Sequence, residues 1–299
     1  MIRPFATGMI LLLGSAMPLA SIAQSASPPM PSDQAMPAED VPARVLPAND
    51  PWGVAPADEW QFHATIYGWL PDIGGKTIFQ TDAGNVGVGI SAKTIVRNLD
   101  FTTQAEFEAK KGRVGFLLDY IYMNLGGSKS NPGSVTTGGA ALPPGVGSDL
   151  HLDVKGNVGA VGITYNMFTL PRVTMDVLGG ARLFYQKERL DWTFTGDVDQ
   201  LSVPPSGHAE TKIDNWDAII GVKGRVVLDS QGKWFIPYYL DGGAGESERT
   251  WQALVGLGYQ FHWGSINASY RWLDYEFKPD SAISDMSYNG PALGVSFKW

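Results

Sequence analysis

Two pairs of an acidic residue and a histidine stand two positions apart in this chain, and they are its best candidates for catalysis. Asp149 precedes His151, and His208 precedes Glu210. A carboxylate beside an imidazole can orient the ring as a general base, which hydrolysis of a peptide or lipid would need. Such spacings are also common among ordinary polar loop residues. We therefore predict no catalytic residue, and a hydrolase that uses Asp149 and His151 is the least favoured alternative.

Metal and cofactor chemistry has little support in the sequence. The other two histidines, His63 and His262, have no ligand partners at metal-binding spacing. The absence of cysteine excludes thiolate zinc sites, cysteine nucleophiles and disulfides. Glycine-rich stretches at 87–89 and 242–245 lack the context of a phosphate-binding loop. We predict no metal and no cofactor, and a net charge of -8 argues against nucleic acid as a partner.

Ten charged residues each lie on the polar face of a segment in which apolar and polar residues alternate. Such a segment is a β-strand whose successive side chains point to opposite faces. The polar faces are otherwise rich in glycine, alanine and serine, which favours an enclosed interior. The ten residues are Glu106, Glu108, Asp119, Asp176, Arg182, Asp217, Lys223, Arg225, Asp241 and Arg271.

The alternating segments predict ten antiparallel strands. We expect them at 60–69, 101–110, 114–122, 150–165, 173–185, 216–226, 234–243, 251–261, 266–272 and 290–299. Outer loops, most of them long, are expected at 71–99, 126–149, 194–210, 246–249 and 279–285, and they alternate with short inner turns at 111–112, 166–172, 229–233 and 262–264. An even strand number with this asymmetry is typical of a closed transmembrane β-barrel with long outer loops and short periplasmic turns. Eight or twelve strands remain open, because 77–81 and 86–91 could form a further hairpin.

Tryptophans favour a barrel in a membrane over a soluble sandwich or a lipocalin-like barrel. The set Trp60, Trp234, Trp263 and Trp299 falls at the predicted periplasmic ends, and the set Trp69, Trp192, Trp216, Trp251 and Trp272 at the outer ends. Two such belts mark the two interfaces of a membrane. The last strand ends on Phe297 and Trp299, as do the terminal strands that barrel assembly machinery recognises. We predict that these two residues are an assembly signal.

Five stretches carry a resemblance to a known family. They are FEAKKGR (107–113) running into 119–122, WDAIIGVKGR (216–225), WFIPYY (234–239), WQALVGLGY (251–259) and YRWLDY (270–275). The chain resembles the uncharacterised outer-membrane β-barrel proteins of proteobacteria over most of residues 60–299. The resemblance implies a fold and a place in the outer membrane of a Gram-negative cell, and it implies no activity. The acid–histidine pairs resemble omptin-type surface proteases in residue types only.

The amino-terminal region predicts export. Residues 1–23 combine a basic start, an apolar stretch and small residues before Gln24, as a cleaved signal peptide does. Gly8, Gly14 and Pro18 disfavour the alternative of an uncleaved anchor helix. Residues 24–58 are rich in proline and alanine, which predicts a disordered linker. Residues 59–299 are then one barrel domain.

The predicted strand number limits the function. A ten-stranded barrel is only slightly wider than the eight-stranded barrels that side chains fill. We expect the ten charged residues to form a charge-paired plug in the lumen, with a narrow polar conduit or a solute pocket as the alternative.

The sequence thus predicts a monomeric, non-catalytic structural or small-solute barrel, porin-like in fold. A surface-binding, adhesive module acting through loops 71–99 and 126–149 is the second hypothesis. Expected partners are outer-membrane lipid, the barrel assembly machinery and periplasmic chaperones.

Overall fold

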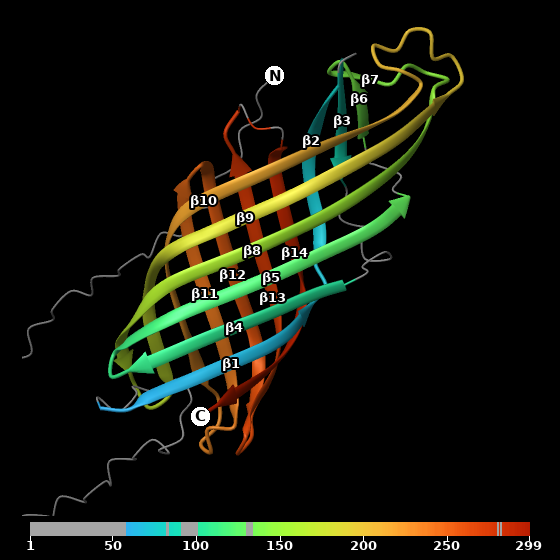
Figure 1. Ribbon diagram of the computed structural model, residues 1–299. Helices are drawn as coiled ribbons and strands as arrows, with labels where there is room; N and C mark the ends of the chain where they lie inside the picture. The colour runs from blue at the N-terminus through green and yellow to red at the C-terminus, as the bar shows by residue number, and fades with distance from the viewer. Residues whose placement is uncertain (1–57, 82–83, 91–100, 130–133, 280, 282) are drawn as a thin grey trace, which may run out of the picture. The chain divides into compact units, whose positions relative to one another are not determined.

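A computed structural model describes residues 58–299 except 82–83, 91–100, 130–133, 280 and 282. The described residues form β-strands, turns and loops (Figure 1). Within this part of the chain, no helix is long and apolar enough to cross a membrane. The predicted signal peptide lies outside the described residues, as does the predicted linker up to residue 57.

Ten strands form a closed antiparallel ring, which confirms the predicted fold class. In ring order they are β1 (Trp60–Trp69), β4 (Phe101–Lys111), β5 (Val114–Lys129), β8 (Gly147–Thr169), β9 (Val173–Thr195), β10 (Ser206–Val227), β11 (Trp234–Gly245), β12 (Ser247–Gln260), β13 (Gly264–Phe277) and β14 (Ile283–Lys298). Pairing of β14 with β1 closes the ring, with Ile66 opposite Val295. Closure satisfies the backbone hydrogen bonds that an open sheet edge would leave exposed.

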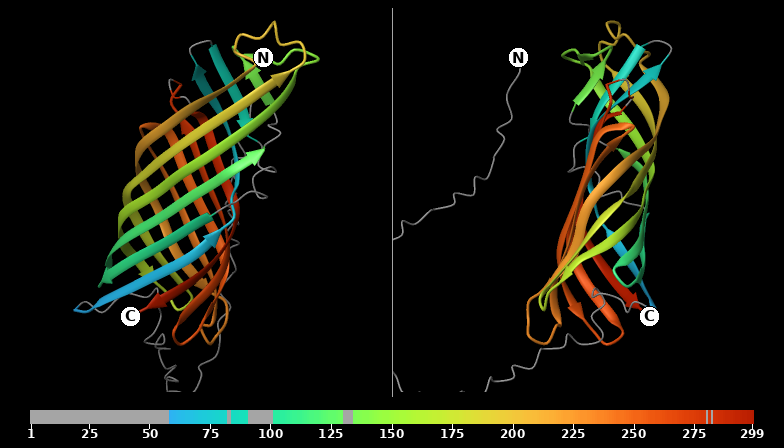
Figure 2. Two further views of the ribbon diagram at one scale, coloured as in Figure 1. Left: turned by 45° about the vertical axis from the view of Figure 1, so that its right-hand side comes forward. Right: turned by 90° about the vertical axis from the view of Figure 1, so that its left-hand side faces the viewer.

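Four further strands lie outside the ring. They are β2 (Asp72–Thr81), β3 (Gly84–Ile90), β6 (Ser134–Thr137) and β7 (Ala140–Ala141), and they continue the sheet in this order from the start of β14. Of the possible hairpin of 77–81 with 86–91, the described residues form β2–β3, in which 77–81 pair with 84–88, and the ring of ten is unchanged. Figure 2 shows these strands at one end of the barrel and the C-terminus at the other. We call these the loop end and the turn end.

Toward the turn end, each ring strand has an outward row of mainly apolar side chains and an inward row of mainly polar ones. Outward side chains such as Ile163, Ile220 and Leu293 are 64%, 75% and 62% exposed. Their inward neighbours are mainly small or polar and include the ten predicted charged residues, with Leu117, Leu178 and Ile219 among the apolar exceptions. Apolar side chains on the outside of a closed barrel are the arrangement that a lipid environment stabilises. The predicted assignment of the two faces is confirmed.

Two strands, β9 and β10, are much longer than the sequence pattern indicated. We predicted that β9 ends at Tyr185 and that β10 starts at Trp216, but β9 continues to Thr195 and β10 starts at Ser206. Beyond Tyr185 the alternation persists with its faces exchanged, so that Arg189 is outside and Leu190 inside. Figure 1 shows β8, β9 and β10 running obliquely toward β2, β3 and β6.

We call residues 147–155 of β8, 187–195 of β9 and 206–214 of β10, together with β2, β3, β6 and β7, the loop-end extension. Its polar outside and apolar inside are those of a sheet in water. The change of faces between Tyr185 and Lys187 marks the outer limit of the membrane-spanning part on β9.

The outer tryptophan belt contains fewer residues than predicted. Trp216 and Trp251 are exposed and Trp272 is partly exposed on the outer wall, but Trp69 is 0% and Trp192 is 4% exposed inside the barrel. The two wrong assignments have the same cause, because residues two positions apart on a strand point to the same face. Trp69 therefore points inward like Tyr67, and Trp192 points inward like Leu190. At the turn end, the set Trp60, Trp234, Trp263 and Trp299 is exposed as predicted.

Candidate functional site

All ten predicted charged residues point into the ring. Nine of them are buried, and Glu106 is partly buried. The strands that carry them are β4, β5, β9, β10, β11 and β13, so the charges converge from opposite sides of the barrel. Their hydrogen bonds and ion pairs fall into two groups, one in the middle of the lumen and one nearer the turn end.

The central group is built around Arg271 of β13. Its guanidinium donates hydrogen bonds to Asp119 Oδ2, Gln252 Oε1 and the Tyr67 hydroxyl, each at 2.7 Å. The Tyr67 hydroxyl in turn donates to the other oxygen of Asp119 at 2.5 Å. Because β13 and β5 are separated by three strands in the ring, the pair of Arg271 and Asp119 crosses the lumen.

Gln252 connects this group to a second arginine. Arg182 donates to Gln252 Oε1 at 3.4 Å and to the Thr250 hydroxyl at 3.1 Å, and it forms an ion pair with Asp241. The Tyr239 hydroxyl donates to the same Asp241 at 2.5 Å. Two cations and two carboxylates are therefore joined through one amide, and together they span the lumen between β5 and β11.

The group nearer the turn end is a chain of alternating charges. Lys110 Nζ lies 2.5 Å from Asp176 and 3.4 Å from Glu108. Lys223 Nζ lies 3.4 Å from Glu108 and 3.3 Å from Glu106. These pairs join β9, β4 and β10 across the barrel, and burial of such charges requires this mutual compensation.

Two of the ten predicted residues have other surroundings. Asp217 accepts hydrogen bonds from the Asn215 amide at 2.7 Å and from the backbone N–H of Ser247 at 2.9 Å. The Arg225 guanidinium lies 5.2 Å from the centre of the Phe235 ring, a cation–π contact. Neutral donors and an aromatic face thus complement the ion pairs.

The prediction omitted several members of this network. Lys110 has the same parity on β4 as Glu106 and Glu108, so the alternation contained the signal. Tyr67, Gln252 and Tyr239 also lie on inward rows. The predicted network contained charged residues only, so it lacked the neutral side chains whose hydroxyl and amide groups connect the ion pairs.

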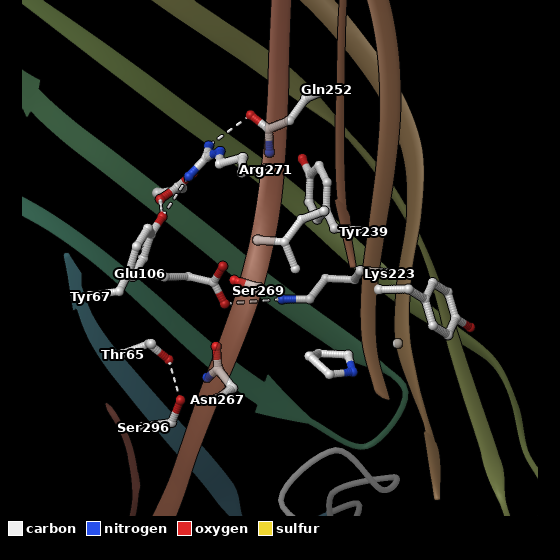
Figure 3. Close-up of a pocket in the computed structure, with 15 residues that line it drawn as sticks. Thr65, Tyr67, Glu106, Lys223, Tyr239, Gln252, Asn267, Ser269, Arg271 and Ser296 are labelled. Atoms are coloured by element: carbon white, nitrogen blue, oxygen red, sulfur yellow. Dashed lines mark hydrogen bonds and ion pairs between the residues drawn. The ribbon is translucent and has the colours of Figure 1, made fainter. Parts of the chain in front are cut away.

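A small cavity lies in the lumen between the two groups (Figure 3). Its volume is about 80 Å³, and Glu106, Lys223, Tyr239 and Arg271 are among its lining residues. Such a space holds a few water molecules, whereas pockets for small-molecule ligands have volumes of roughly 300–1,000 Å³. The cavity therefore fits solvent that completes the hydrogen bonding of the plug.

An apolar core lies above the central group, toward the loop end. Trp69, Phe184, Tyr275 and Tyr288 are buried in it, with the Phe184 and Tyr275 rings 4.5 Å apart. The Arg271 guanidinium lies 5.3 Å from the centre of the Trp69 ring, where the polar and apolar layers meet. Side chains of the ring strands and of β2 and β3 contribute to this core, which covers the lumen.

The acid–histidine pairs lie on the outer wall of the loop-end extension. His151 of β8 and His208 of β10 both stand opposite Asp191 of β9, and Asp149 stands opposite Thr193. A hydrogen bond from Arg189 lowers the pKa of Asp191, and a hydrogen bond from Lys187 lowers that of Glu210. These carboxylates are held in ion pairs on an exposed sheet face.

The predicted assembly residues lie at the seam of the ring. Trp299 exchanges backbone hydrogen bonds with Phe62 of β1, at 3.0 and 3.2 Å, and its ring stacks on that of Phe62 at 6.0 Å. Phe297 and Trp299 are exposed on the outer wall. Their role in assembly stays a prediction.

No protein-family model and no curated protein matches the sequence. Among solved structures, the chain is similar to the outer-membrane protease OmpT of Escherichia coli, with a TM-score of 0.53 and 9% identity over 81% of this chain and 97% of that one. The translocator domain of the autotransporter NalP of Neisseria meningitidis gives a TM-score of 0.34 and 14% identity over 85% and 91%. Ail of Yersinia pestis gives 0.29 and 9% over 81% and 99%. The likeness to OmpT concerns the fold, which is that of an outer-membrane β-barrel.

Proposed function

We propose that the chain is an outer-membrane β-barrel whose membrane-spanning part is a sealed, non-conducting scaffold. One observation carries this proposal: the lumen is crossed by the hydrogen-bonded network of Arg271 and Arg182 and is covered by an apolar core on the loop-end side. An ion that entered would have to separate buried ion pairs and then pass Trp69 and Phe184. Both steps are costly in a low-dielectric interior.

Planar-bilayer recording tests the sealed lumen. We expect the purified, folded protein to give no discrete channel events under conditions in which an open porin conducts. Discrete events in the wild-type protein would overturn the proposal and favour the conduit. Cell fractionation tests the location separately, since recovery outside the outer-membrane fraction would contradict it.

A second candidate function is binding at the cell surface. The observation that favours it is the loop-end extension, in which β8 and β9 are 23 residues long and present polar side chains outward above their own apolar core. A rigid sheet raised above a membrane is suited to contact with a macromolecule. Replacing loop 196–205 with glycine and serine should then abolish binding to a surface ligand, and the same replacement at turn 228–233 should not. Equal binding by both variants would contradict this function.

The proposal includes no catalytic residue. Asp149 and His151 lie on an outward sheet face, where a substrate would stay in contact with water. Hydrolysis of a peptide or lipid that is lost in His151→Ala would contradict this part of the proposal.

A further inference from the structure

The outer wall of β8, β9 and β10 combines an apolar groove with a row of lysines. The groove has a volume of about 460 Å³ and lies on the lipid-facing part of the wall. The residues that line it are Ile163, Tyr165, Val177, Leu178, Gly179, Ile220, Gly221 and Val222. Gly179 stands between Ile163 and Ile220 in the strand register, and its missing side chain hollows the wall. A groove of this composition fits an acyl chain.

The lysine row lies on the same three strands. Lys155, Lys187 and Lys212 are exposed and stand directly opposite one another. Like charges in this arrangement repel each other. Glu210 pairs with Lys187 at 2.8 Å, and Asp214 is exposed two residues from Lys212. A row of cations in a chain of net charge -8 points to an anionic occupant.

The row begins where the membrane-spanning part ends. Each lysine is the first or second outward residue beyond the apolar rows, and Tyr185 and Trp216 mark the end of those rows on β9 and β10. Tyrosine and tryptophan concentrate at the headgroup level of a membrane. The lysines therefore lie at or just above the depth of lipid phosphates, which carry the required charge.

The separation of groove and row matches one lipid molecule. Gly179 and Lys187 are eight residues apart on β9, which is about 26 Å along a strand. At the usual barrel tilt this is about 20 Å along the membrane normal. One leaflet with its headgroups has a similar thickness, since the hydrocarbon core of both leaflets measures about 30 Å.

We propose that the wall of β8, β9 and β10 binds a phosphorylated membrane lipid, with its phosphates at Lys155, Lys187 and Lys212 and an acyl chain in the groove at Gly179. This inference rests on the proposed place in the outer membrane. The opposed like charges of the row and the hollow in the wall have the same explanation, because one molecule supplies both complements.

Native mass spectrometry of the folded protein in dodecyl maltoside tests the proposal. The probes are lipid A, which carries two phosphates, and the same lipid after removal of its phosphates. We expect the wild-type protein to prefer the phosphorylated probe by about tenfold, as charge-assisted bonds to phosphate would give. The triple variant Lys155→Gln, Lys187→Gln, Lys212→Gln should lose this preference, and Gly179→Leu should weaken binding of both probes.

Matched controls separate binding from folding and from net charge. The triple variant Lys111→Gln, Arg172→Gln, Lys233→Gln removes the same charge at the turn end. Gly68→Leu matches Gly179→Leu, because both glycines are on the outer wall and a Cβ at either would meet no atom within 4 Å. All four variants should stay folded, as judged by heat-modifiable migration.

Several results would overturn the proposal. They are equal wild-type affinity for both probes, an unchanged preference in the loop-end triple variant, or equal effects of Gly179→Leu and Gly68→Leu. Displacement of the lipid by excess inorganic phosphate would instead show a site for free anions. The assay uses purified protein, so a failure here is distinguishable from a failure of the outer-membrane location.

Discussion

At the scale of single residues, the stability of the lumen depends on how each buried charge is compensated. Arg271 serves a carboxylate, a phenol and an amide at once, so its removal leaves several buried polar groups without their donor. Removing one partner costs more stability than the intact pair contributes, because the remaining charge stays buried without water and without its partner.

Arg271→Ala should therefore destabilise the folded barrel by about 3–5 kcal/mol, mainly through the charge left on Asp119. Urea unfolding in detergent measures the change. Arg249→Ala is the control, because Arg249 pairs with Glu276 on the surface and its side chain is 73% exposed, and such pairs contribute about 0–1 kcal/mol. Similar midpoint shifts for the two variants would contradict a plug of buried ion pairs.

Glu188 is a residue whose protonation should affect stability. It lies inside the loop-end extension, outside the membrane-spanning part, and burial raises its pKa to about 7 against the opposing hydrogen bonds from Thr77 and Gln186. The folded state thus holds a proton that the unfolded chain releases near pH 4.5. Stability from this group is fully present below that pH and is lost as the pH rises to about 7, by roughly 3 kcal/mol.

Glu188→Gln should remove this dependence. The difference in urea midpoint between variant and wild type should grow in favour of the variant from pH 4.5 to 7 and stay constant above. A difference that is the same at every pH would show that Glu188 does not titrate in this range.

At the scale of elements, the long strands are stabilised by the core that they enclose above the lumen. Phe184 of β9 contacts Tyr275 and Phe277 of β13, with ring centres 4.5 and 5.5 Å apart. These contacts connect β9 to β13 across the barrel, so the apolar core that covers the lumen holds the two walls together.

Phe184→Ala should destabilise the protein by about 3–5 kcal/mol, the usual cost of truncating a buried phenylalanine. Ile220→Ala, on the lipid-facing wall and 75% exposed, is the control and should have a much smaller effect. Thermal unfolding in detergent compares them. A Phe184→Ala variant as stable as the control would mean that the apolar core above the lumen does not stabilise the barrel.

The last strand is the element in which assembly and stability can be separated. Deletion of Trp299 removes two backbone hydrogen bonds with Phe62 and the ring contacts with Phe62 and Phe107, each worth about 1 kcal/mol. If the residue is an assembly signal, the amount of folded barrel in cells should fall far more than this loss explains. Detergent-refolded protein should still fold and should lose only the stability that these contacts contribute. Equal cellular amounts of the truncated and full-length proteins would refute the signal.

At the scale of the whole molecule, the closed ring depends on one seam between the first and last ring strands. Ile66 and Val295 stand opposite each other there, on the outer wall. Directly opposed residues have Cα atoms about 4.5–5.5 Å apart, within the range that a disulfide can bridge.

Because the chain has no cysteine, the double variant Ile66→Cys, Val295→Cys reports closure without interference. We expect a single intramolecular disulfide after oxidation, seen as a mobility change on non-reducing gels. The pair Ile66→Cys, Ile220→Cys joins distant strands and should stay reduced. A disulfide in the second pair, or none in the first, would contradict the ring.

The sequence predicted a ring of ten strands, with eight or twelve left open by the possible hairpin at 77–91, and it predicted the inward direction of the charged residues, because both follow from a period of two. It was insufficient for the loop-end extension, since the period persists past Tyr185 while the faces exchange roles. The individual contacts of the network could not be predicted from the sequence, because contact between Arg271 and Asp119 depends on which strands face each other across the closed ring. The lysine row likewise required the register, as its members lie on three strands.

The exchange of faces between Tyr185 and Lys187 has a mechanical consequence. Sinking the barrel would bring Lys187 and Arg189 toward hydrocarbon, at up to about 2–4 kcal/mol for each charge that reached the midplane. Raising it would expose Leu183 and Ile220 to water. The chain therefore has one immersion depth, which is set by where the outward residues change and is independent of any anchor. The distance by which its surface stands above the bilayer is a fixed property of the sequence.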